Sequence, residues 1–165
     1  YNPTITDMQE DFMTFYKYIQ QYLNDDIDFV ILGHYQLIDL LLTTKEQTIT
    51  ILKLVQERNI SELSSELGTS HPLVQLLTTK TTDQLDLLSQ LFPYDHRTIQ
   101  ALRRWEQWFK SLNVKDIHLD ITPQPPRSYY KGAFLKCYLK NDKNHQLTGG
   151  FYKGELDGFG LGFIL

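Results

Sequence analysis

The N-terminal part of the chain alternates between a helical and an extended hydrophobic pattern. Apolar residues three or four positions apart predict a helix over residues 7–23, with Thr6 or Asp7 as its N-cap. The β-branched and aromatic run 27–32 predicts a strand, and the crowded apolar segment 35–42 predicts a short buried helix. The apolar stripe of the first helix consists of Met8, Phe12, Phe15, Ile19 and Leu23.

Helical spacing dominates from about residue 44 to residue 112. Short amphipathic segments follow one another there, separated by Gly68, Pro72 and Pro93. We therefore expect a helical insert of about four helices at about 44–112. Its last helix, over 98–112, presents an apolar stripe, and Arg103 is expected on its solvent-exposed side.

A period of two returns after residue 113. Apolar and polar residues alternate over 116–121, which predicts a strand. Two apolar and aromatic runs, 129–139 and 146–152, flank the polar segment 140–144 and predict an antiparallel hairpin. Strands separated by helices and followed by a hairpin indicate an α+β fold, with an antiparallel sheet flanked by helices.

Length and composition fit a single globular domain. The chain has 165 residues and a net charge of −4, and its pI near 5.7 argues against a nucleic-acid surface that acts by bulk charge. Cys137 is the sole cysteine, so no internal disulfide forms, and no His or Cys cluster has metal-ligand spacing. We expect no metal, no cofactor and no membrane span, and a cytoplasmic location.

The two ends of the sequence suggest a piece of a longer protein. The chain opens at Tyr1 rather than at methionine, and it stops at Leu165 inside a glycine-rich apolar run where a strand or helix should continue. We expect a partial domain over 1–165, with N-terminal and C-terminal parts of the full protein absent.

Tyrosines and glycines gather in the predicted hairpin. Glycines inside strands often mark close approach by a ligand or another backbone, and a tyrosine ring with one hydroxyl suits an amino-acid or imidazole-like guest. The alternative is that the tyrosines only pack and the glycines form a bulge. Adjacent tyrosines point to opposite faces of a strand unless a bulge intervenes. The candidate ligand-binding residues are Arg127, Tyr129, Tyr130, Gly149, Gly150 and Tyr152.

These motifs resemble the catalytic core of the histidyl-tRNA synthetase family. The segment Ser-Tyr-Tyr-Lys-Gly-Ala-Phe at 128–134 is similar to that family's Tyr-Tyr-Thr-Gly strand. Gly-Gly-Phe-Tyr-Lys-Gly at 149–154 and Gly-Phe-Gly-Leu-Gly at 158–162 are similar to its next two strands, and 29–34 to its strand ending in Gly-His. The resemblance implies a class II aminoacyl-tRNA synthetase-like fold over nearly the whole chain.

Three charged positions of the synthetase pattern are changed in this chain. An ungapped alignment on the tyrosine pair puts Pro125 where the synthetase has the arginine that steers aminoacyl transfer, although Arg127 is near enough to reach in. Phe151 replaces a second arginine, and Leu165 replaces the arginine that holds ATP. Adenylate chemistry needs cationic donors on the developing phosphate charge, so the changes argue against it.

A synthetase-like body without its ATP-handling residues resembles the regulatory subunits of ATP phosphoribosyltransferase, a branch of the same family. That resemblance implies a non-catalytic chain that associates with the short catalytic subunit as a hetero-oligomer, activates it in the first step of histidine biosynthesis and takes part in histidine feedback. It implies histidine as an effector and makes tRNA an unexpected partner. Two alternatives remain: the catalytic core of an active histidyl-tRNA synthetase, and an interaction domain that kept only the fold.

Overall fold

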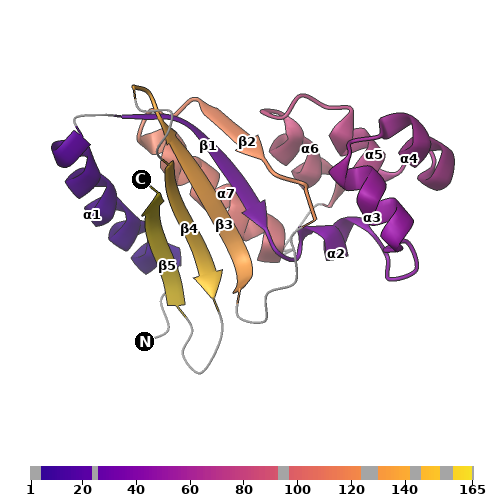
Figure 1. Ribbon diagram of the computed structural model, residues 1–165, viewed down its shortest axis with the longest axis horizontal. Helices are drawn as coiled ribbons and strands as arrows, with labels where there is room; N and C mark the ends of the chain where they lie inside the picture. The colour runs from indigo at the N-terminus through magenta and orange to yellow at the C-terminus, as the bar shows by residue number, and fades with distance from the viewer. Residues whose placement is uncertain are drawn as a thin grey trace.

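A computed structural model describes residues 5–23, 26–92, 97–123, 130–141, 146–152 and 158–164. They form one five-stranded sheet with the strand order β2-β1-β3-β4-β5 (Figure 1). The pairs β1–β3, β3–β4 and β4–β5 are antiparallel, whereas β1 and β2 run parallel at one edge. The strands are β1 (Ile27–His34), β2 (Asp116–Leu119), β3 (Tyr130–Leu139), β4 (Gln146–Tyr152) and β5 (Gly158–Ile164).

Two long helices lie on one face of this sheet, and a group of short helices lies beyond its β2 edge (Figure 1). The helix α1 (Ile5–Leu23) begins two residues before the predicted boundary, so Thr6 and Asp7 lie in its first turn rather than at its N-cap. None of the helices in the described ranges is long and apolar enough to cross a membrane. The other helices are α2 (Leu37–Leu41), α3 (Ile49–Gln56), α4 (Ile60–Leu67), α5 (Pro72–Leu77), α6 (Gln84–Leu91) and α7 (Arg97–Ser111).

The core lies between one face of the sheet and the helices α1 and α7. The ring of Phe12 on α1 meets the rings of Trp105 and Phe109 on α7 edge to face, with ring centroids 6.0 and 5.5 Å apart. Fully buried rings of this size contribute much of a core's apolar area. On the sheet side the core continues through Val30, Leu32, Ile117, Leu119, Leu135, Cys137, Leu139 and Leu147.

The range 44–112 contains five helices rather than the about four we predicted, because residues from Pro72 onward form a short helix of their own, α5. Gly68 ends α4 at a φ of 96°, which glycine adopts without strain, and Pro72 begins α5 at a position where its missing N–H costs nothing. The helix α7 packs on α1, α6, β1 and β3, whereas α3–α6 pack mainly on one another, and their strongest contacts with the rest of the molecule are those of α6 with α7 and β2. We call α3–α6 the insert helices.

Local caps define several insert helices. Thr48 Oγ1 accepts a hydrogen bond from the Ile51 amide at the start of α3, and Asn59 Oδ1 accepts one from the Glu62 amide at the start of α4. At α5, His71 Nδ1 accepts from an amide of the first turn while its Nε2 lies 3.0 Å from Glu46 Oε2. These side chains satisfy backbone donors that the helix itself leaves free.

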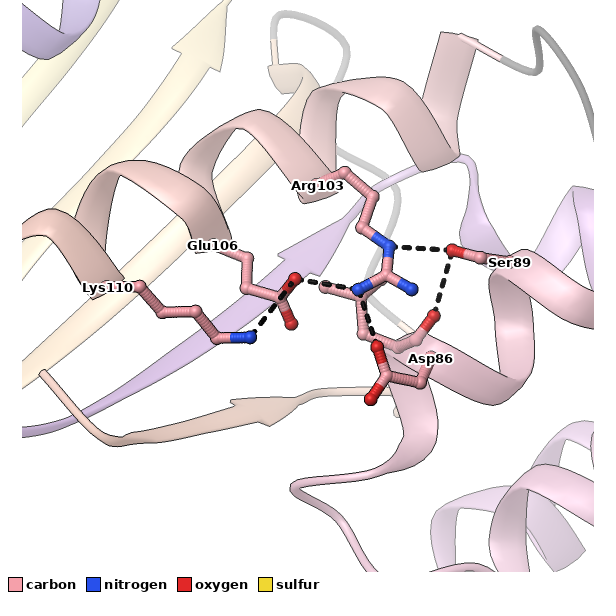
Figure 2. A network of polar contacts seen from close by, with 6 residues as sticks. Asp86, Ser89, Arg103, Glu106 and Lys110 are labelled. Atoms are coloured by element: carbon pink, nitrogen blue, oxygen red, sulfur yellow. Dashed lines mark hydrogen bonds and ion pairs between the residues drawn. The ribbon is translucent and has the colours of Figure 1, made fainter.

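Arg103 joins the insert helices to α7 (Figure 2). Its Nε donates to Ser89 Oγ on α6 at 2.8 Å, and one terminal nitrogen lies 2.7 Å from both Asp86 and Glu106 carboxylate oxygens. Burial alone would lower the pKa of Arg103, but the hydrogen bonds to the two carboxylates raise it above its usual value. The expected solvent-facing arginine is therefore a tether between helices.

Candidate functional site

The face of the sheet turned away from α1 and α7 is the open face. Successive residues of a strand point to opposite sides, so the core residues Val30 and Leu32 put Phe29, Ile31 and Gly33 on this face. On β3 the same alternation assigns Phe134, Lys136 and Tyr138 to it, since Leu135, Cys137 and Leu139 belong to the core. The side chains of Phe29 and Tyr138 are stacked, with centroids 4.5 Å apart.

A row of glycines crosses the open face. Phe134 lies opposite Gly33 on one side and Gly150 on the other, and Gly150 lies opposite Gly160 of β5. The Phe134 ring sits so close to Gly33 that a Cβ there would lie 2.2 Å from its Cζ atom. Tyr35 contacts the same ring from a centroid distance of 5.1 Å. A glycine in a strand often marks the place where a ligand or another backbone comes close. At Gly33 the group that comes close is the ring of Phe134, which belongs to the protein itself.

Four of the six predicted ligand-binding residues lie in described strands. Tyr130 and Tyr152 are directly paired across β3 and β4, and Gly149 and Gly150 follow in the same ladder. The pairing shifts between Tyr130 and Phe134, where Gly132 has a φ of 89°, so the β3–β4 ladder is irregular on the Phe134 side of Tyr130. Arg127 and Tyr129 lie outside the described residues, and the use of these six residues as a ligand site stays a prediction.

A second feature of the open face was not predicted from the sequence. A cavity of about 550 Å³ lies where β1 and β2 meet the insert helices. His118 on β2 is held there, with its Nδ1 atom 2.7 Å from Thr81 Oγ1 and its ring edge to face with Phe29. The lining residues are Asp28, Phe29, Ile31, Arg58, Thr81, Asp116, His118, Leu119 and Asp120.

The alternation of polar and apolar residues in β2 could have indicated which of its side chains face this cavity. Ile117 and Leu119 are buried in the core, so Asp116 and His118 belong to the other side of the strand. The sequence alone does not predict which residues form the wall opposite His118, because Thr81 comes 37 residues before His118.

The described residues include no candidate metal site, and the cysteine among them is buried. The described ranges hold no group of three or more His, Cys, Asp or Glu side chains arranged for a metal ion. Cys137 is fully buried on the core side of β3, and burial raises the pKa of its thiol well above the ordinary value. A buried thiol with a raised pKa is a poor nucleophile at neutral pH.

The arrangement of a mainly antiparallel sheet, helices on one face and a helical insert is a class II aminoacyl-tRNA synthetase-like fold. In the ATP phosphoribosyl transferase (HisG:HisZ) complex from Thermotoga maritima, one chain matches 98% of this chain, over 61% of its own length, with a TM-score of 0.69 and 15% identity. The crystal structure of an ATP phosphoribosyltransferase regulatory subunit/histidyl-tRNA synthetase from Bacillus halodurans C matches 92% of this chain, over 44% of its own length, with a TM-score of 0.59 and 15% identity.

Sequence comparison gives the family. The family described as histidyl-tRNA synthetase matches residues 22–162, and the chain belongs to it. Curated relatives named ATP phosphoribosyltransferase regulatory subunit, from Staphylococcus epidermidis and from Staphylococcus aureus strain JH1, are 48% and 47% identical over all 165 residues. The chain spans 61% of the length of these relatives.

Proposed function

We propose that the full-length protein is a non-catalytic regulatory subunit, which associates with the short catalytic subunit of ATP phosphoribosyltransferase and activates it in the first step of histidine biosynthesis. The observation that carries this proposal is the 48% and 47% identity to staphylococcal regulatory subunits across the whole chain. The proposal includes a hetero-oligomer, a cytoplasmic location and no cofactor.

The changed motif positions support a chain without adenylate chemistry. Phe151 lies in β4, opposite Phe159 of β5, at the position where the synthetase pattern has an arginine. A phenylalanine offers no donor to a phosphate oxygen, whereas transfer at phosphorus depends on positioned cations and hydrogen-bond donors. Pro125 and Leu165, the other two changed positions, lie outside the described residues.

The glycine-rich end of the β3–β4 ladder is the proposed place for histidine in feedback inhibition. Tyr130 and Tyr152 are paired there, and the nearby residues Gly149 and Gly150 of β4 have no side chains that would fill the space next to them. Tyrosine hydroxyls can bond an amino-acid guest while their rings bound it. Tyr129 and Arg127 complete the proposed site.

Reconstitution with a short-form catalytic subunit tests the proposal. The full-length protein is co-expressed with that subunit carrying the affinity tag, and we expect it to copurify and to raise phosphoribosyltransferase activity above that of the catalytic subunit alone. L-Histidine should inhibit the complex. Failure to copurify and to activate would contradict the proposed function.

A second assay separates the synthetase alternative. Histidine-dependent exchange of pyrophosphate into ATP is measured with the full-length protein, and we expect no exchange above background. Exchange that Arg127→Ala abolishes would show that Arg127 replaces the changed arginines and that the chain is a synthetase. Absence of both exchange and association would leave the interaction-domain alternative.

A further inference from the structure

The cavity at the β1–β2 edge has walls from two parts of the molecule. Phe29 and His118 stand on the open face of the sheet, whereas Arg58 follows α3 and Thr81 precedes α6. Its volume of about 550 Å³ lies within the range of roughly 300–1,000 Å³ usual for small-molecule sites. A molecule bound there would contact the sheet and the insert helices together.

The sheet side of the cavity is an aromatic wall. Phe29 stands between His118, at a centroid distance of 5.8 Å and nearly perpendicular, and Tyr138, stacked at 4.5 Å. These contacts fix the Phe29 ring, and Ile31 and Leu119 add apolar surface beside it. A fixed ring with apolar neighbours suits the apolar or ring part of a ligand, and ring faces also attract cations.

The polar groups around this wall favour a positive charge. Three carboxylates line the cavity, against the single guanidinium of Arg58. Over the described ranges, neither Asp28 nor Asp116 forms an ion pair, while Asp120 accepts a hydrogen bond from the Thr122 amide at 2.9 Å. Because the carboxylates outnumber the one guanidinium and two of them form no ion pair within the described part of the chain, they lower the energy of an ammonium group bound in the cavity.

We propose that this cavity binds a small organic cation, a protonated amine carried on a ring or apolar body. The ring lies against Phe29, and the ammonium group faces the carboxylates of Asp28 and Asp116. Because Arg58 and Thr81 form the other wall, the bound molecule ties the insert helices to the sheet. The site is separate from the proposed histidine site, since Phe29 pairs with Tyr138 at the end of β3 remote from Tyr130.

A charge series of three similar probes tests the chemistry of this cavity. Binding of 2-phenylethylamine, 2-phenylethanol and phenylacetate to the full-length protein is measured by ligand-observed NMR titration at about pH 7. We expect the amine to bind about tenfold more tightly than the alcohol, and phenylacetate to bind most weakly. Raising the ionic strength from about 0.02 to about 0.3 M should weaken binding of the amine and leave the alcohol unaffected.

Variants locate the site. Asp28→Asn and Asp116→Asn should each weaken amine binding about fivefold, whereas Asp11→Asn, on the exposed surface of α1, should leave it unchanged. The alcohol should bind all three variants like the parent, which reports an intact fold. Hydrogen exchange of the backbone amides locates the site in the parent protein, without any variant. The amine should slow exchange around residues 57–59 and 80–82, because Arg58 and Thr81 line the cavity.

Three results of these measurements would contradict an amine site in this cavity. Equal binding of the amine and the alcohol, or unchanged amine binding in both aspartate variants, would overturn the proposal. Slowed exchange confined to the β3–β4 end of the sheet would also overturn it, because the amine would then occupy the proposed histidine site instead.

Discussion

Phe134 lies over Gly33 so closely that its Cζ atom would stand 2.2 Å from a Cβ atom at residue 33. The two residues are directly paired across β1 and β3, so the ring reaches across the ladder to occupy the space above its partner. This contact explains why the strand tolerates a glycine at that point. It also makes residue 33 sensitive to a single added methyl group.

Gly33→Ala should lower the free energy of unfolding by about 1–3 kcal/mol, because Phe134 must leave its position to admit the methyl group. Urea unfolding of the full-length protein measures the change. The matched control is the double variant Gly33→Ala/Phe134→Leu, in which the smaller side chain makes room. The loss in the double variant should be smaller than the sum of the two single losses, and strict additivity would contradict the contact.

Arg103→Met should destabilise the protein by about 2 kcal/mol, because it leaves the Glu106 carboxylate with little compensation at a side chain only 6% exposed. Lys110 remains 3.8 Å from that carboxylate and limits the loss. Arg104→Met is the control on the neighbouring exposed position and should change the stability little. Adding Glu106→Gln to Arg103→Met should restore part of the lost stability. Equal urea midpoints for the parent and Arg103→Met would contradict the tether.

Glu46 should stabilise the fold at neutral pH and lose that effect in acid. The Thr43 amide donates to its carboxylate and, together with His71, holds the pKa of Glu46 below its ordinary value of 4.5. A depressed folded pKa gives a stabilising contribution above the unfolded pKa that disappears as the pH falls through the folded value. The difference in unfolding free energy between the parent and Glu46→Gln should therefore narrow from about pH 7 to about pH 3. A difference independent of pH would contradict this role.

Tyrosine hydroxyls at the proposed histidine site should contribute to ligand binding. Tyr129→Phe, Tyr130→Phe and Tyr152→Phe are compared by calorimetry with L-histidine on the complex with the catalytic subunit. At least one of them should weaken binding by about 0.5–1.5 kcal/mol, because a bonded hydroxyl is lost. Tyr18→Phe, on a side chain 64% exposed on α1, is the control and should bind histidine like the parent. Unchanged binding in all three variants would reduce these tyrosines to packing residues and move the histidine site elsewhere.

Local patterns were enough to predict most of the elements of this fold. The stripe ending at Leu23, the apolar run from Ile27 and the hairpin around residues 140–145 depend on neighbours within a few positions, and all three elements are present. The sequence analysis did not predict that β2 pairs in parallel with β1. That pairing depends on residues far apart in the sequence, which meet only after the helical range 44–112 has folded.

The same reason limits prediction of the sites. His118 belongs to no cluster with metal-ligand spacing in the sequence, and only the folded chain brings it to Thr81 and Phe29. Arg103 was expected to face solvent because its partners Asp86 and Ser89 belong to a different helix. Tyr130 and Tyr152 were brought together by sequence reasoning because a hairpin with a short connection fixes its own register.

The pairing of β1 with its two neighbours, β2 and β3, determines when the sheet can be completed. The hairpin β3–β4 closes over a few residues, whereas about 80 residues lie between β1 and β2 and about 95 between β1 and β3. Closing such long connections costs entropy before any contact offsets it, so the hairpin should form early and both pairings of β1, including the β1–β2 edge, late. Until that edge closes, the wall of the cavity that carries His118 does not exist, and any ligand of the cavity binds only to the completed fold.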